Sequence, residues 1–139
     1  MYNTFVLDAC AIIAYYKKEN GGRIVYDILR SAIKGEARVF MHKINLYEVY
    51  YGLYIEYGEA FANAVLEQLN NIELIIDSEI TDEIFAKAAY FKIKHGRMSL
   101  ADSYLLAEAA VRGAKIVTCD HHELDLVERS GLLEFLWIR

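Results

Sequence analysis

Short apolar runs alternate along this chain with longer segments in which apolar residues recur at helical spacing. The first run, Phe5, Val6 and Leu7, has the composition of a strand covered on both faces. Further β-favouring runs stand at residues 38–41, 72–76, 115–119 and 135–138. Helices are predicted at residues 11–17, 24–33, 44–57, 60–69, 81–94 and 99–111, with a helical turn after His122. This alternation predicts a three-layer α/β/α domain with a central parallel sheet of about five strands.

The composition allows a single domain over residues 1–139, because 55% hydrophobic residues can bury a core without disulfides or a structural metal. The apolar stretches are shorter than the roughly 20 residues that span a bilayer, and the N-terminus lacks a basic segment followed by an apolar one. Two cysteines do not make the disulfide framework of a small secreted protein. We therefore expect a cytoplasmic protein with reduced thiols and no membrane segment.

The formal net charge of −5 argues against a broad basic surface for duplex nucleic acid. It does not exclude an enzyme that acts on nucleic acid. Where several acids gather around a divalent cation, the metal supplies the positive charge that the protein surface lacks.

Four acidic residues occupy comparable places in this pattern. Asp8 and Asp120 each follow a predicted strand directly. Because ligands of open α/β sheets bind beyond the carboxyl ends of the strands, both are candidates for a site. Asp102 lies in the first turn of the helix that leads to the strand before Asp120, and Glu48 lies within helix 44–57. Each also has a plain structural explanation: a helix cap for Asp8, a capping box with Ser99 for Asp102, a turn for Asp120 and solvation for Glu48.

The coincidence of the four acids favours a shared site. Carboxylates within a few ångströms repel one another, so without a cation at least one takes up a proton or the site loosens. Hard oxygen ligands suit Mg²⁺ or Mn²⁺, which activate water and stabilise a phosphorus transition state. Our hypothesis is that Asp8, Asp102 and Asp120 bind the metal and that Glu48 positions the attacking water.

The same acids lie in four short motifs, namely V-L-D-A-C-A at 6–11, N-L-Y-E at 45–48, S-L-A-D at 99–102 and V-T-C-D at 117–120. With these motifs in this order, the chain resembles the PIN-domain ribonucleases, and more narrowly the VapC-type toxins of bacterial and archaeal toxin–antitoxin pairs. The resemblance implies a parallel sheet flanked by helices and an Mg²⁺ or Mn²⁺ site at Asp8, Glu48, Asp102 and Asp120. It also implies metal-dependent cleavage of single-stranded RNA, a cognate antitoxin and a homodimer.

The chain departs from the family pattern near two of these acids. Cys10 stands where the family often has Ser, Thr or Asn, and a thiol is a poorer hydrogen-bonding partner for the metal site. After Asp120, Glu123 and Asp125 either add a carboxylate to the site or cap the following helix, and we favour the cap.

Two further clusters have competing interpretations. Cys10, Cys119, His121 and His122 stand near the same strand ends but lack a CxxC pair, so buried thiols are a better interpretation than a zinc site. A few basic residues could contact RNA phosphates or could simply be solvated helix positions. They are Lys43, Lys94 and Arg97.

Five tyrosines fall within residues 44–57 at spacings that place several on one side of a helix. Such a stripe could stack bases, pack in the core or form an interface. We favour a surface for a partner protein, and the family resemblance implies an antitoxin peptide there.

Two other classes of function stay open. A Mg²⁺-dependent phosphatase or phospho-receiver domain also places acids at strand ends. However, Cys10 rather than a second acid stands two residues after Asp8, and the chain lacks the adjacent early acids and strand-end lysine of a receiver. A noncatalytic PIN scaffold that binds RNA or protein is the other alternative, and the intact acids at all four positions disfavour it.

Overall fold

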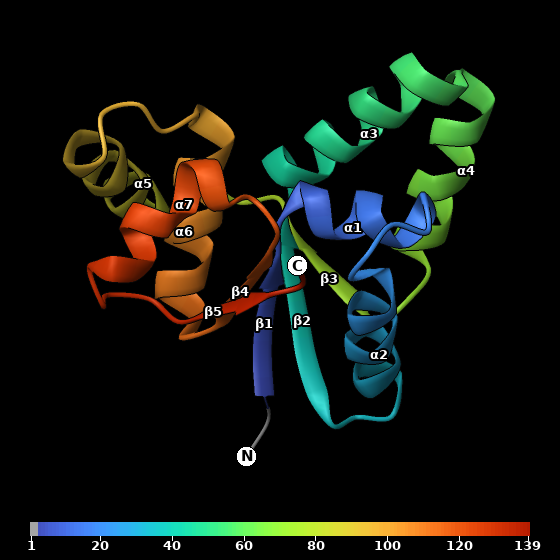
Figure 1. Ribbon diagram of the computed structural model, residues 1–139, viewed down its shortest axis with the longest axis horizontal. Helices are drawn as coiled ribbons and strands as arrows, with labels where there is room; N and C mark the ends of the chain where they lie inside the picture. The colour runs from blue at the N-terminus through green and yellow to red at the C-terminus, as the bar shows by residue number, and fades with distance from the viewer. Residues whose placement is uncertain (1–2) are drawn as a thin grey trace.

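The protein is described by a computed structural model that covers residues 3–139 (Figure 1). The strands are β1 (Asn3–Leu7), β2 (Ala37–His42), β3 (Leu74–Asp77), β4 (Lys115–Thr118) and β5 (Phe135–Trp137). The helices are α1 (Ala9–Tyr16), α2 (Gly22–Ile33), α3 (Lys43–Tyr57), α4 (Glu59–Asn70), α5 (Asp82–Lys94), α6 (Leu100–Arg112) and α7 (His121–Arg129).

All five strands join one parallel sheet in the order β3-β2-β1-β4-β5. The first strand is therefore central, and Phe5 lies between Val39 of β2 and Lys115 of β4. Because all the strands run in one direction, the residues that follow β1, β2 and β4 leave the sheet at the same edge. The predicted α/β/α class and parallel sheet are confirmed.

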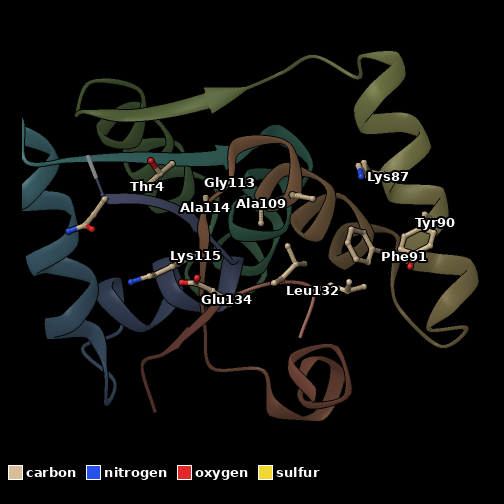
Figure 2. A pocket seen from close by; sticks show the side chains of 13 residues that line it. Thr4, Lys87, Tyr90, Phe91, Ala109, Gly113, Ala114, Lys115, Leu132 and Glu134 are labelled. Atoms are coloured by element: carbon tan, nitrogen blue, oxygen red, sulfur yellow. The ribbon is translucent and has the colours of Figure 1, made fainter. Parts of the chain in front are cut away.

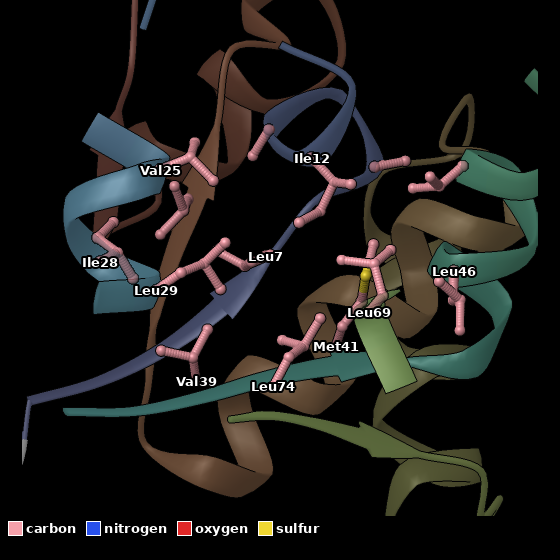
Figure 3. Close-up of a cluster of buried hydrophobic side chains, with 14 of the residues drawn as sticks. Leu7, Ile12, Val25, Ile28, Leu29, Val39, Met41, Leu46, Leu69 and Leu74 are labelled. Atoms are coloured by element: carbon pink, nitrogen blue, oxygen red, sulfur yellow. The ribbon is translucent and has the colours of Figure 1, made fainter. Parts of the chain in front are cut away.

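Alternate side chains of each strand enter different hydrophobic layers, as the two-residue repeat of a strand requires. Leu7 and Met41 pack with α1 to α4 in one layer, whereas Val6, Phe40 and Ile116 pack with α5 to α7 in the other. Figure 3 shows the first layer, where Leu7, Ile12 and Met41 meet between the sheet and its helices. Both faces of the sheet are thus covered, which explains the continuous apolar runs in the sequence.

The predicted elements differ from the observed ones mainly at their ends. The first helix begins at Ala9 rather than at residue 11, because Asp8 caps it. The segment α7 is a helix of 9 residues rather than a single turn. Within residues 3–139, no helix is both long and apolar enough to cross a membrane.

Helix α3 starts directly after β2 at the carboxyl edge of the sheet and then extends away from it, with α4 packed alongside (Figure 1). The two helices form a projecting pair that is joined at Gly58, whose φ of 93° is in the left-handed region that favours glycine. This arrangement leaves the start of α3 at the carboxyl edge of the sheet and its end in solvent.

Candidate metal centre

Asp8 is the first residue after β1 and serves as the N-cap of α1. Its Oδ1 accepts a hydrogen bond from the backbone N–H of Ala9 at 2.7 Å, and its Oδ2 accepts one from the Thr118 hydroxyl at 2.7 Å. Only 4% of Asp8 is exposed. Asp8 can therefore cap the helix and belong to a site at the same time, because its carboxylate lies at the carboxyl edge of the sheet.

Asp120 reaches the same place from the end of β4. The Thr118 hydroxyl that donates to Asp8 also accepts a hydrogen bond from the Asp120 backbone N–H at 3.0 Å. Asp120 Oδ1 in turn accepts from the backbone N–H of Glu123 at 3.2 Å and caps α7. One buried hydroxyl thus links the two strand-end acids across neighbouring strands.

The other two acids come from helices. Asp102 lies in the first turn of α6, where its backbone N–H donates to the Ser99 hydroxyl at 3.0 Å, so Ser99 is the predicted N-cap. Glu48 lies in the second turn of α3 and is half-buried. The crossover of α6 to β4 therefore carries Asp102 to the edge where Asp120 leaves the sheet.

Carboxylate oxygens of Asp8, Asp102 and Asp120 all lie within 4.8 Å of one another. A pocket of about 380 Å³ opens over them. Its other lining residues are Ala9, Cys10, Ile13, Glu48, Tyr51, Gly52, Ser99 and Glu123. All four predicted acids thus share one pocket, with three of them close enough to hold a common ion.

The electrostatics of this pocket favour a cation. Burial, together with the charges of Asp8 and Asp120, raises the pKa of Asp102 to about 7. Burial is also the main cause that raises the pKa of Asp8 and of Glu48. No lysine or arginine lines the pocket to offset the acids. A set of hard oxygen donors with this uncompensated charge fits a divalent cation such as Mg²⁺ or Mn²⁺.

The two acids after Asp120 for which the sequence allows two roles lie in different surroundings in the structure. Glu123 lines the pocket, whereas Asp125 pairs with His121 at 2.8 Å. The prediction that one of these two acids caps the helix is wrong, because Asp120 itself accepts the capping hydrogen bond.

Cys10 lines the pocket and touches the acid network. Its thiol lies 3.6 Å from Asp8 Oδ2 and 3.5 Å from the Thr118 hydroxyl, and it accepts from the Cys119 backbone N–H at 3.2 Å. Within residues 3–139, neither group of potential metal ligands with atoms this close contains a cysteine. The pairing of His121 with Asp125 and Arg139 likewise disfavours the zinc alternative.

The predicted RNA-contacting residues Lys43, Lys94 and Arg97 are all exposed, and none of them lines the acidic pocket. Lys43 begins α3, while Lys94 ends α5 and Arg97 lies in the loop before α6. Any contact with phosphate would therefore be made outside the pocket.

A second buried acidic cluster, His42, Asp77 and Glu108, was not predicted from the sequence. His42 uses both ring nitrogens: Nδ1 accepts from the backbone N–H of Ile44 at 3.1 Å, and Nε2 lies 3.1 Å from the Glu79 carbonyl. Arg112 pairs with both acids, at 3.3 Å to Asp77 and 3.0 Å to Glu108. Both nitrogens of the His42 imidazole already have partners, and the Arg112 guanidinium already neutralises the acids. This cluster is therefore a structural network rather than a metal site.

A larger cavity, of about 620 Å³, lies at the opposite edge of the sheet, near the starts of β1 and β4. Figure 2 shows Lys115 and Glu134 beside the strands and Tyr90 and Phe91 on α5. Size does not decide the assignment here, because a metal centre requires converging oxygen ligands, and these occur in the smaller pocket.

A parallel α/β sheet with a cluster of carboxylates at its carboxyl edge defines a class of domains built to hold divalent cations. Within that class, the chain belongs to the PIN domain family: the family model matches residues 5–129. PIN domains are a family of nucleases. Among curated proteins, no sequence matches the chain.

Solved structures share this fold over almost the whole chain. The DNA-bound VapBC of Salmonella typhimurium has 20% identity and a TM-score of 0.70, with 100% of both chains covered. VapBC2 of Rickettsia felis bound to a promoter DNA fragment has 16% identity and a TM-score of 0.71, with 96% of this chain and 98% of that chain covered. VapC20 of Mycobacterium tuberculosis, a Sarcin-Ricin loop cleaving toxin, has 14% identity and a TM-score of 0.63, with 82% and 87% covered. The resemblance to VapC-type proteins is therefore confirmed at the level of the fold.

Proposed function

We propose that this protein is a metal-dependent endoribonuclease that cleaves single-stranded RNA as the toxin of a type II toxin–antitoxin pair. The observation that carries the proposal is the convergence of Asp8, Asp102 and Asp120 within 4.8 Å at the carboxyl edge of the sheet. Membership of the PIN domain family supports a nuclease. VapC20, which shares the fold, is a toxin that cleaves the Sarcin-Ricin loop, and this supports RNA as the substrate class.

In this proposal Asp8, Asp102 and Asp120 hold Mg²⁺ or Mn²⁺. The cation, when bound, supplies an activated water and stabilises charge on the scissile phosphate. The chain's own contribution is to fix the three carboxylates: Thr118 holds Asp8, and Ser99 holds the first turn that carries Asp102. Half-buried Glu48 faces the same pocket and orients the attacking water.

Substrate binding would depend on the cation as well as on the protein, because the net charge of −5 repels a phosphate backbone. Lys43, Lys94 and Arg97 stand exposed outside the pocket, where they would contact flanking phosphates. This arrangement assigns cleavage to the acids and positioning of the strand to the basic residues.

We assign the exposed tyrosine surface of α3 to the antitoxin. Tyr47, Tyr51, Tyr54 and Tyr57 are each more than 40% exposed, and Ile55 beside them is 81% exposed. A row of large apolar side chains in solvent is typical of an interface. The fold is shared with the VapBC of Salmonella typhimurium and with a toxin–antitoxin complex from Klebsiella pneumoniae, which supports an antitoxin as the partner. The family resemblance adds a homodimer to the proposal, and the sequence composition adds a cytoplasmic location.

The test is cleavage of a mixed single-stranded RNA pool by antitoxin-free protein, with Mg²⁺ or Mn²⁺ and with EDTA. We expect cleavage only with metal, and its loss in Asp102→Asn. A folded, metal-loaded protein that leaves every RNA intact would contradict the proposal and favour a noncatalytic scaffold or a phosphatase. Cleavage that Asp102→Asn retains would contradict the site.

A further inference from the structure

The first turns of two helices that carry acids of the pocket contact each other. Asn45 lies in the first turn of α3 and Ala101 in the first turn of α6. The Asn45 side chain donates from Nδ2 to the Ala101 carbonyl at 3.1 Å. Within residues 3–139, no other side-chain hydrogen bond joins α3 to α6. It therefore fixes how these two helices approach each other at the pocket.

Both helices carry an acid of the pocket next to this contact. Glu48 stands three residues after Asn45, so the two side chains lie on neighbouring turns of one helix face. Asp102 directly follows Ala101 in the chain. The Asn45 amide thus links the two helices that carry Glu48 and Asp102.

Asn45 also influences the Glu48 carboxyl. Burial and the charge of Asp8 raise the pKa of Glu48, and the polar Asn45 side chain opposes that rise. An amide NH₂ group has two hydrogens, and the bond to the Ala101 carbonyl uses one of them. The second hydrogen is available to Glu48, which stands on the next turn of the same helix face.

Packing alone does not account for an asparagine at this position. Asn45 is 0% exposed, and its Oδ1 has no hydrogen-bond partner. A buried unpaired carbonyl costs stability, and an apolar side chain of similar size would avoid that cost. Its neighbour Leu46 shows that the first turn of α3 accepts a buried apolar residue.

We propose that Asn45 is a positioning residue of the metal centre, which joins α3 to α6 and sets Glu48 and Asp102 in register for metal binding and hydrolysis. The expected effect on RNA cleavage rests on the proposed function. The expected effect on metal binding depends only on how the acids are arranged, so it can be measured without RNA.

The test uses the full chain with Asn45→Leu, which removes the donor while keeping a side chain branched at Cγ. The matched control is Asn63→Leu, because Asn63 Oδ1 accepts from the Tyr50 hydroxyl at 2.6 Å and so joins α3 to α4 away from the pocket. Asn45→Ala removes the same donor without adding branches and replaces the leucine variant if that variant does not fold.

The first measurement is the rise in melting temperature caused by Mn²⁺, with no RNA present. We expect Asn45→Leu to melt near wild type without metal but to lose about half or more of the Mn²⁺-induced rise, because its metal affinity is lower. Asn63→Leu should keep the full rise. A full rise in both Asn45 variants, an equal loss in Asn63→Leu, or no rise in wild type would overturn the inference.

The second measurement is RNA cleavage. We expect Asn45→Leu to lower kcat about tenfold while KM for RNA stays within about twofold, since the substrate-binding surface is unchanged. In a Glu48→Gln background the same change should cost less than about twofold, because the two residues act as a unit. Equal losses in both backgrounds would overturn the link to Glu48. If wild type gains stability from Mn²⁺ but cleaves no RNA, the proposed function fails while the first measurement still decides the role of Asn45.

Discussion

The hydroxyl of Thr118 donates to Asp8 Oδ2 at 2.7 Å and at the same time accepts from the backbone N–H of Asp120 at 3.0 Å. Thr118 is completely buried at the end of β4, beside the central strand β1. A single side chain therefore orients one acid and the backbone of another, on two strands that are far apart in the sequence.

Replacing Thr118 with valine tests this link, because valine has the same shape but no hydroxyl. We expect the free energy of unfolding to fall by about 1–3 kcal/mol, since Asp8 loses a buried donor. We also expect weaker Mn²⁺ binding, measured by calorimetry, because Asp8 is no longer oriented. Thr118→Ser keeps the hydroxyl and should retain most of the affinity. Equal Mn²⁺ affinity in Thr118→Val and wild type would show that the hydroxyl does not organise the site.

The raised pKa of Asp102 predicts how the metal-free protein responds to pH. Folding raises this pKa from 3.8 to about 7, so the protonated carboxyl favours the folded state. That contribution is complete in acid and is lost as the pH rises through about 7. Metal-free wild type should therefore melt at a lower temperature at about pH 8 than at about pH 6, and Asp102→Asn should show a smaller difference. The same difference in Asp102→Asn would contradict this cause.

Proton release should accompany metal binding for the same reason. A cation binds the deprotonated carboxylates and must displace the proton that Asp102 holds near pH 7. Mn²⁺ affinity of wild type should therefore rise between about pH 6 and pH 8, and calorimetry in buffers of different ionisation enthalpy should report released protons. An affinity that does not change over this range would show that the acids are already ionised without metal.

Glu108 in the buried cluster with Asp77 and His42 should affect stability but not the metal centre. Burial and the Asp77 carboxylate raise the pKa of Glu108 to about 7, so its ionisation opposes folding above that pH. Glu108→Gln cannot ionise and should melt at a higher temperature than wild type at about pH 8, with little change at about pH 5. Its Mn²⁺-induced rise in melting temperature should match wild type. A loss of that rise would show that this second cluster binds metal.

The main parts of the fold and site follow from local patterns in the sequence. Buried strands read as continuous apolar runs, so Asp8 and Asp120 stand out as the polar residues that end them. The helix start at Ser99 predicts Asp102 in the first turn of the helix, and the structure confirms this position. Glu48 had the weakest local signal, and its place in the pocket depends on how α3 crosses the edge of the sheet.

The remaining features depend on contacts between distant segments. Thr118 looks like an ordinary strand residue until β4 is placed beside β1. The helical pattern does not predict the burial of Asn45, because the contact with Ala101 forms only when α6 packs against α3. Glu108 meets Asp77 only through the packing of α6 on the sheet, which no periodicity in the chain reveals.

The most direct test of the metal centre is anomalous X-ray diffraction from crystals of the protein grown with Mn²⁺. We predict a strong anomalous peak among the carboxylates of Asp8, Asp102 and Asp120, and its loss in Asp8→Asn crystals. A peak at His42, Asp77 and Glu108 instead, or no peak at the three aspartates at saturating Mn²⁺, would contradict the account.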